Sequence, residues 1–262
     1  MLLKFYKYHG AGNDFIVIDN RDKGFITSKD RIQWLCDRHF GIGADGLMTL
    51  ENDNKYDFRM HYFNSNGIEG TMCGNGGRCI VHFAKKINVI QQMESKFIAI
   101  DGTHKALIIS DEIIRLEIKD VAFNQIYNIA NGMLLDTGSP HFVRFQKDIN
   151  SLDVYVQGQK IRYDSIFNKQ NGVNVNFVEI KDSYLKMRTY ERGVENETLA
   201  CGTGAVAVAL AAAIRNNLDS PVNIKARGGS LKVYFNLSNK VFQNIWLEGP
   251  VKCVFSAHIN LV

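Results

Sequence analysis

The sequence predicts an α+β protein of two pseudo-symmetric lobes, each a mixed or antiparallel β-sheet wrapped around a central helix. Three observations support this class. Short β-rich stretches far outnumber helical ones and do not alternate with them. Two cysteine-glycine turns, each followed by an apolar run, stand in similar surroundings in the two halves of the chain. A length of 262 residues suits one large domain or two ordinary ones.

The first lobe is expected over residues 1–118, completed by a C-terminal strand over 251–262. Its strands are predicted where β-branched and aromatic residues cluster, at 15–19, 58–63, 97–100, 106–109 and 113–118. Two helices are predicted there, one over 28–37 with Ser28 as its N-cap, and one over 76–87.

The second lobe is expected over residues 119–250, joined to the first near Lys119 without a flexible linker. Its strands are predicted at 141–145, 173–180, 185–190, 222–226, 231–235 and 241–247. The clearest helix of the whole chain is predicted over 205–216. We expect the active site in the cleft between the lobes.

Composition excludes several classes of protein. The net charge of +4 is spread along the chain, which argues against nucleic acid as a partner. The longest apolar run, residues 205–214, is too short to span a bilayer, and the charged N-terminus does not resemble a signal peptide. Five cysteines, an odd number in a chain of this size, favour reduced thiols in the cytoplasm and no structural disulfide.

The most informative feature is a repeated motif, Cys-Gly-Asn-Gly-Gly from Cys73 and Cys-Gly-Thr-Gly-Ala from Cys201. Aligning the two cysteines also pairs three flanking residues of each half, Tyr62 with Tyr190, Asn64 with Arg192 and Glu69 with Glu197. A thiol at a helix N-terminus ionises more readily, and the N–H groups there bind a carboxylate. The repetition therefore predicts two thiols that act on the two faces of one carboxylate-bearing carbon.

A structural interpretation competes with this one. A single such motif is better explained as a tight turn leading into a buried helix. Its occurrence twice, with matched flanks, reverses that preference. The other cysteines fit structural roles: Cys36 and Cys253 are expected to be small buried hydrophobic residues, and the spacing of Cys73, Cys79 and His82 matches no usual zinc site, so no metal is expected.

Seven ordered motifs together resemble the diaminopimelate epimerase family over nearly the full length. They are Tyr8–Phe15, Gly41–Gly46, Phe63–Gly67, Cys73–Cys79, Pro140–His141, Gly172–Phe177 and Tyr190–Gly193 ahead of Cys201–Gly204. The resemblance implies an isomerase that interconverts LL- and meso-2,6-diaminoheptanedioate, in lysine and peptidoglycan precursor synthesis, without pyridoxal phosphate. It also implies a homodimer, although Phe255 stands where a tyrosine is often found.

Inversion of an α-carbon without a cofactor requires a base on one face and an acid on the other, which Cys73 and Cys201 can provide in either direction. The carbanion formed would be stabilised by backbone donors at Gly74, Asn75, Gly202 and Thr203. No electron-sink cofactor is then needed, and the sequence carries no pyridoxal-lysine or dinucleotide signature.

The distal amino-acid group of such a substrate needs a carboxylate clamp and an ammonium acceptor, which Arg192 and Glu191 can supply. By resemblance, the polar lining is completed by Asn13, Asn64 and Asn174, while His141 and Glu191 support the cysteines as catalytic residues. Ser139 and Gly46 depart from the asparagine and glutamine frequent in the family, and both shorten polar reach near the site.

The same residues are compatible with three other functions. A cofactor-independent racemase of similar fold acting on proline or hydroxyproline would have a small apolar pocket, against which Asn64, Glu191 and Arg192 argue. A cysteine hydrolase with His141 as base would leave the second matched cysteine without a role. A binding module on the same scaffold would bind substrate without exchange of its α-hydrogen.

Overall fold

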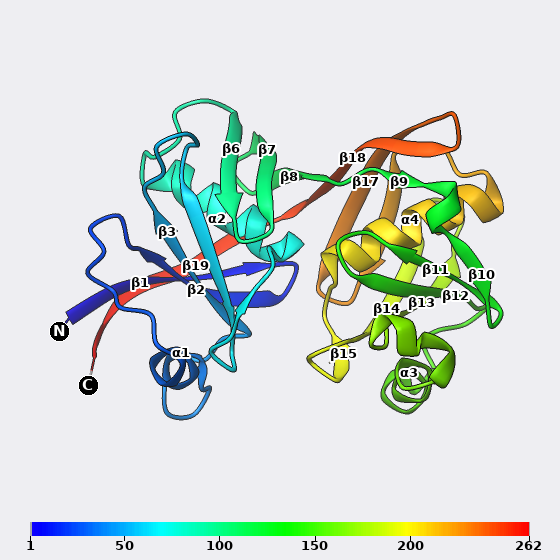
Figure 1. Cartoon of the computed structure of the whole chain (residues 1–262), viewed down its shortest axis with the longest axis horizontal. Coiled ribbons are helices and arrows are strands. Elements are labelled where there is room, and N and C mark those ends of the chain that lie inside the picture. The colour runs from blue at the N-terminus through cyan, green and yellow to red at the C-terminus, as the bar shows by residue number, and fades with distance from the viewer. Residues whose placement is uncertain (1, 262) are drawn as a thin grey trace. The chain divides into compact units, whose positions relative to one another are not determined.

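The computed structural model describes residues 2–261, and the chain divides into two compact units. Unit 1 comprises Met1–Leu116 and Pro250–Val262, and unit 2 comprises Glu117–Gly249. Because the last segment of the chain returns to unit 1, the N- and C-terminal segments form neighbouring strands, β1 (Leu2–Gly10) and β19 (Lys252–Asn260), which pair antiparallel (Figure 1).

Unit 1 is a mixed sheet with two helices. Along the chain its elements are β1, β2 (Asn13–Asp19), α1 (Lys29–Cys36), β3 (Gly46–Glu51), β4 (Arg59–Asn64), β5 (Glu69–Gly70), α2 (Gly74–Lys86), β6 (Glu94–Ala99), β7 (Gly102–Ser110), β8 (Ile113–Ile118) and β19. Strands β2 and β3 pair parallel, as do β4 and β6, and the other neighbours pair antiparallel. Each parallel pair is joined through a helix, α1 or α2, as a parallel connection requires.

Unit 2 has a second mixed sheet. Its elements are β9 (Val121–Ala122), a 3₁₀ turn (Phe123–Gln125), β10 (Tyr127–Ile129), β11 (Gly132–Asp136), β12 (Pro140–Phe145), α3 (Val154–Arg162), a 3₁₀ helix (Ser165–Gln170), β13 (Asn174–Ile180), β14 (Leu185–Glu191), β15 (Asn196–Thr198), α4 (Gly202–Asn216), β16 (Val222–Ala226), β17 (Gly229–Ser238) and β18 (Val241–Pro250). The parallel pairs are β12 with β13 and β14 with β16.

The two units repeat one topology. In each, an antiparallel hairpin (β1–β2 or β11–β12) leads through a helix to a parallel neighbour, which pairs antiparallel with the next strand. A short strand and a second helix then lead to another parallel neighbour and two further antiparallel strands. The predicted α+β class with pseudo-symmetric halves is confirmed.

Helices α2 and α4 occupy the centre of their units. Helix α2 packs on β1, β2, β3 and β7, and α4 packs on strands β11 to β14, β16 and β17. In α2, every residue from Gly74 to Ala84 except His82 is buried. In α4, every residue from Gly204 to Ala213 is buried. The buried glycines of α2 and the buried alanines of α4 let strands approach these helices closely. Each cysteine motif therefore begins the central helix of its unit.

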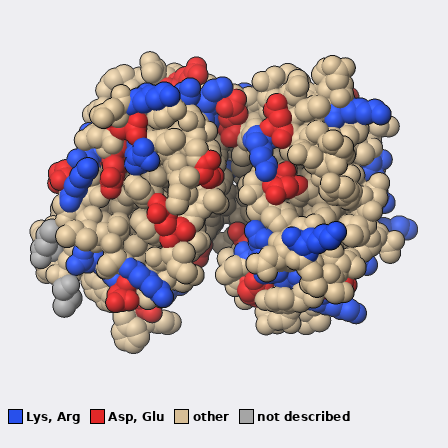
Figure 2. Space-filling view, in the orientation of Figure 1, with Lys and Arg blue, Asp and Glu red and all other residues tan. Residues whose placement is uncertain are grey.

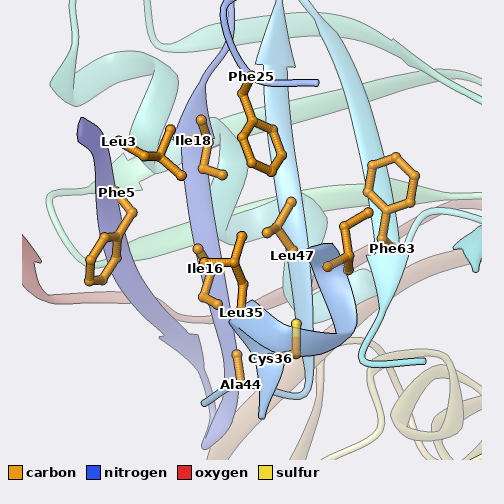
Figure 3. Close-up of a cluster of buried hydrophobic side chains, with 11 residues drawn as sticks. Leu3, Phe5, Ile16, Ile18, Phe25, Leu35, Cys36, Ala44, Leu47 and Phe63 are labelled. Carbon is orange, nitrogen blue, oxygen red and sulfur yellow. The ribbon is translucent and has the colours of Figure 1, made fainter. Parts of the chain in front are cut away.

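The outer face of the unit 1 sheet is covered by α1. Leu3, Phe5, Ile16 and Leu47 from the strands belong to the same buried cluster as Leu35 and Cys36 of the helix, as Figure 3 shows. The expectation that Cys36 is a small buried hydrophobic residue is confirmed, since it lies within this cluster and burial raises the pKa of its thiol to about 12.

Most predicted elements are confirmed within a few residues. Ser28 occupies the N-cap position of α1 but makes no side-chain capping bond, so that part of the prediction was wrong. The central helices begin two to three residues earlier than predicted, at Gly74 and Gly202, because their glycines form the first helical turn. Cys253 lies in β19 as expected but is only partly buried.

Several elements of the structure were not predicted from the sequence. Helix α3 has no counterpart among the predictions, although Asp153 caps it by accepting a bond from the N–H of Val156 at 3.0 Å. Strand β1 was missed because a β-bulge between Lys7 and Tyr8 interrupts its alternation of buried and exposed residues. Strand β3 is buried on both faces and therefore shows no alternation.

Charged residues are interspersed rather than segregated on the face of each unit that Figure 2 shows. This distribution agrees with the small net charge of +4. Across residues 2–261, every helix is too short or too polar to cross a membrane.

Candidate active site

In unit 1, the site is built around the N-terminus of α2. Cys73 occupies the N-cap position with an extended backbone, and its carbonyl accepts the first helical bond from the N–H of Gly77 at 2.7 Å. The N–H groups of residues 74–76 precede that bond and point along the helix axis toward the cysteine end. The positive end of the helix dipole thus lies beside the Cys73 thiol, where it favours the thiolate.

Asn13 connects Cys73 to the β1–β2 hairpin. Its Oδ1 accepts from Cys73 Sγ at 3.6 Å and from Asn75 Nδ2 at 3.3 Å, while its Nδ2 donates to Asp45 Oδ2 at 2.7 Å. Three predicted site residues, Asn13, Cys73 and Asn75, are therefore brought together. The hairpin turn that carries Asn13 contains Ala11 and Gly12 with φ of 51° and 86°.

Asp45, which accepts from Asn13, belongs to a cluster of four charged side chains. Arg38 bridges Asp14 and Asp45 at 2.7 and 2.8 Å, and Lys7 pairs with Asp14 at 2.7 Å. Burial raises the pKa of Asp14, but the bonds from Arg38 and Lys7 outweigh that effect and bring it to about 2. Asp14 therefore remains an anionic acceptor at neutral pH.

Asn64 lies at the end of β4, in the turn before β5. Its Oδ1 accepts from the Tyr62 hydroxyl at 3.1 Å, and its Nδ2 donates to the carbonyl of Ile68 at 3.4 Å. Gly46, where the sequence departs from a frequent glutamine, has no room for a side chain. A Cβ there would lie 2.7 Å from both the Phe63 carbonyl oxygen and the Tyr62 ring. The Tyr62 ring thus fills the space that a side chain at position 46 would need.

In unit 2, Cys201 occupies the equivalent N-cap position of α4, and its carbonyl accepts from the N–H of Ala205 at 2.9 Å. Cys201 Sγ lies 3.7 Å from the Thr203 hydroxyl, which in turn lies 2.9 Å from His141 Nε2. The Thr137 hydroxyl donates to the Thr203 carbonyl at 2.8 Å. His141 therefore reaches the cysteine through Thr203.

His141 is a buried, neutral imidazole. Burial lowers its pKa to about 3, so it carries no proton charge at neutral pH. Asn176 Nδ2 donates to His141 Nδ1 at 3.2 Å, which leaves the proton on Nε2, and this Nε2–H can donate to the Thr203 hydroxyl. The Thr203 hydroxyl hydrogen is then available for Cys201 Sγ.

Glu191 is the last residue of β14, Arg192 follows it, and separate contacts hold the two side chains. The backbone N–H of Arg192 donates to Asn174 Oδ1 at 2.9 Å, and its Nη1 donates to the Gln170 carbonyl at 3.1 Å. Glu191 Oε2 accepts from the Thr198 hydroxyl at 2.8 Å. The structure thus joins Asn174 to Arg192, two residues predicted to contact the distal end of the substrate.

Two residues that contact the predicted site residues were not themselves predicted to belong to the site. Asn176 is buried and connects His141 to the Thr189 hydroxyl, from which its Oδ1 accepts at 3.0 Å. Ser139, identified only as a departure from the family pattern, lies 3.0 Å from His141 Nε2 and accepts from Asn174 Nδ2 at 3.2 Å. The repeat itself could have signalled α3, since the offset that aligns the two cysteines also places α1 opposite α3.

The pKa of His141 predicts a pH dependence of stability. A histidine with a pKa near 6.5 when unfolded and about 3 when folded binds a proton preferentially in the unfolded chain. Its stabilising contribution is therefore complete above pH 6.5 and falls as the pH drops toward 3. Between pH 7 and 5 we expect His141 alone to reduce the free energy of unfolding by about 2 kcal/mol.

Urea denaturation at pH 7 and pH 5 checks this expectation by comparing the protein with His141→Gln. The glutamine variant is expected to be less stable at pH 7 but to lose about 2 kcal/mol less than the parent protein on acidification. Equal losses in both proteins would show that His141 is not held neutral by burial.

The fold places the chain in a structural class. The structure of a PhzF-family phenazine biosynthesis protein from Bacillus anthracis is similar with a TM-score of 0.73 and 12% identity, covering 100% of both chains. A probable proline racemase from Agrobacterium radiobacter K84 is similar with a TM-score of 0.71 and 11% identity, covering 99% of this chain and 93% of that one. These likenesses show that the chain shares its fold with a PhzF-family protein and with a probable proline racemase.

The sequence comparisons are more specific. The diaminopimelate epimerase family model matches residues 5–112 and 133–254. The diaminopimelate epimerase of Flavobacterium psychrophilum is 50% identical over 260 residues, covering 98% of this chain and 100% of the relative. The chain therefore belongs to the diaminopimelate epimerase family and is an isomerase, as its motifs predicted.

Proposed function

We propose that this protein interconverts LL- and meso-2,6-diaminoheptanedioate by proton transfer between two cysteines and the α-carbon. The observation that carries the proposal is the duplicated site: Cys73 and Cys201 each occupy the N-cap of a buried central helix in topologically equivalent units. The family's name and the 50% identity with a diaminopimelate epimerase indicate which substrate to expect.

In the proposed reaction, one cysteine acts as a thiolate and removes the α-proton, so that the C–H bond breaks and an S–H bond forms. The electron pair remains on the α-carbon and spreads into its carboxylate. The second cysteine acts as a thiol on the opposite face and gives its proton to the carbon, which leaves it as a thiolate. The next turnover runs the two roles in reverse, and no external acid or base is consumed.

The α-carboxylate would accept bonds from the N–H groups at the starts of α2 and α4. Backbone donors at Gly74, Asn75, Gly202 and Thr203 would hold the increased negative charge on its oxygens in the transition state. Donors fixed by a helix need no reorganisation as the charge develops, which lowers the barrier to forming the carbanion. The Cys201 site has further support from Thr203 and His141, which we assign to orienting that thiol.

The distal end of the substrate carries a second carboxylate and an ammonium group. Arg192 would bind the carboxylate through its guanidinium, and Glu191 would accept from the ammonium. Asn13, Asn64 and Asn174 would complete the polar lining. This charged clamp distinguishes diaminopimelate from proline, whose ring offers no distal charges.

The remaining proposals concern assembly and location. We propose a homodimer that buries apolar residues exposed on β1 and β19, where Leu2 is 63%, Val254 54% and Phe255 47% exposed. Sedimentation of the parent protein and of Phe255→Glu tests it, and a monomeric parent protein would refute it. A biosynthetic isomerase of this family is expected in the cytoplasm, acting in lysine and peptidoglycan precursor synthesis.

Proton NMR in deuterated buffer tests the function. Reduced protein is mixed with LL-diaminopimelate, and the α-proton signal and the meso product are followed without added pyridoxal phosphate. We expect loss of the α-proton signal together with formation of the meso isomer, and no change in L-proline under the same conditions. Exchange in proline but not in diaminopimelate would favour the racemase alternative, and binding without exchange would favour a binding module.

A further inference from the structure

The guanidinium of Arg192 is held by the loop that precedes β13. Its Nη1 donates to the carbonyl of Gln170 at 3.1 Å and to that of Gly172 at 3.4 Å. Both bonds come from one nitrogen, so they do not use the edge formed by Nε and Nη2, through which an arginine can bind a carboxylate bidentately. The positions of these two carbonyls therefore decide where that edge points.

Arg162, the last residue of α3, packs against the same loop. Its Nη1 donates at 3.0 Å to the carbonyl of Asn171, the residue between the two whose carbonyls hold Arg192. A Cβ at Gly172 would overlap this Nη1, so the guanidinium occupies the space that a side chain there would need. Asn171 and Gly172 both have a left-handed backbone, with φ of 53° and 74°. Arg162 therefore fixes the shape of the loop that bonds Arg192.

Arg162 also contacts the turn that carries the backbone of Arg192. Its Nη2 donates to Glu195 Oε1 at 3.1 Å, and the same oxygen accepts from the N–H of Gly193 at 3.0 Å. The N–H of Glu195 donates to the Glu191 carbonyl at 2.8 Å, which closes the turn around Arg192. Arg162 thus joins the loop that bonds the Arg192 guanidinium to the turn from which that side chain extends.

The ion pair between Arg162 and Glu195 is largely shielded from water, since the two side chains are 12% and 33% exposed. Burial raises the pKa of Glu195, but the Gly193 N–H, the neighbouring Tyr163 hydroxyl and the charge of Arg162 outweigh that effect and lower it. Glu195 is therefore a carboxylate at neutral pH. Removal of either member of the pair would leave the other in a partly buried site without its partner, which loosens both the loop and the turn.

We propose that Arg162 and Glu195 are positioning residues that hold the Arg192 guanidinium in place for the distal carboxylate of the substrate. The inference rests on the proposed role of Arg192 in binding that carboxylate. A mobile arginine side chain samples many rotamers, and ordering it on binding weakens affinity by up to about tenfold. Arg162 and Glu195 order Arg192 in advance, so they favour substrates with a second carboxylate without contacting the substrate themselves.

Steady-state kinetics test the proposal in two backgrounds. Arg162→Met and Glu195→Gly are each expected to raise KM for diaminopimelate about tenfold and to change kcat less than about twofold. Glycine accepts the φ of 55° at position 195 without strain, so that variant removes only the side-chain contacts. In an Arg192→Ala background, the same two changes should raise KM by less than a further factor of about two. An unchanged KM in the parent background, or equal increases in both backgrounds, would overturn the proposal.

Lys160→Met is the matched control, because it removes the same charge from an exposed position of the same helix. It should leave KM and kcat unchanged.

A second measurement needs no turnover. Amide hydrogen exchange of Arg192 and Gly193, followed by NMR, should become about tenfold faster or more in Arg162→Met and should not change in Lys160→Met. Unchanged exchange in a folded Arg162→Met protein would overturn the proposal. Absence of epimerisation by the parent protein would refute the proposed function alone, because amide exchange reports on the turn without substrate.

Discussion

Cys73→Ala and Cys201→Ala are each expected to lower the rate of diaminopimelate epimerisation by about 10³-fold or more. Each substitution removes one of the two groups that carry the α-proton, and general acid–base groups contribute up to about 10⁴-fold each. The losses should not add in the double variant, since inversion already fails when either thiol is missing. Epimerisation is measured by following the meso isomer from the LL substrate.

The two single variants should also differ in a way that loss of folding could not produce. Each retains one thiol, so any residual exchange of the α-proton with deuterated solvent should occur without inversion. That exchange should favour one stereoisomer in Cys73→Ala and the other in Cys201→Ala. Cys253→Ala is the matched control, because this partly buried cysteine of β19 has no proposed catalytic role. Full epimerisation by either active-site variant would refute the two-thiol mechanism.

Arg192→Ala is expected to lower kcat/KM for diaminopimelate by about 10²-fold or more. Removal of one partner from a hydrogen-bonded charge pair costs roughly 2 to 5 kcal/mol, and about 1.4 kcal/mol corresponds to a factor of ten. Most of the loss should appear in KM, because the distal carboxylate is bound equally before and during the reaction. The kcat/KM of Arg192→Lys should lie between those of the parent protein and Arg192→Ala, since lysine keeps the charge but lacks the planar pair of donors.

A control separates the clamp from general effects of charge. Arg215 lies in the last turn of α4 and stacks over the Phe145 ring at 4.8 Å, away from the Asn174 and Arg192 contacts. Arg215→Ala removes the same charge and should change kcat/KM less than about twofold. An unchanged KM in a folded Arg192→Ala protein would show that Arg192 does not hold the distal carboxylate, and the substrate assignment would then need another recognition group.

The sequence determined the fold class, the repeat and the chemical motifs because these are written in local patterns. Alternation of apolar residues marks strands exposed on one face, such as β8 and β16, which match their predicted ranges. Glycines after Cys73 and Cys201 mark the starts of the central helices, and the order of motifs identifies the family. Asn13, Cys73 and Asn75 could be selected as site residues before any contact between them was known.

The tertiary structure decided what depends on the environment of a residue rather than on its neighbours in sequence. Arg78 and His141 are both completely buried, which no local pattern of the chain shows, and burial lowers the pKa of both side chains. Strand β3 is apolar throughout because both its faces are covered, and β1 loses its alternation at a bulge that only pairing with β19 defines. Burial and pairing arise from residues far apart in the chain, so a local pattern cannot encode them.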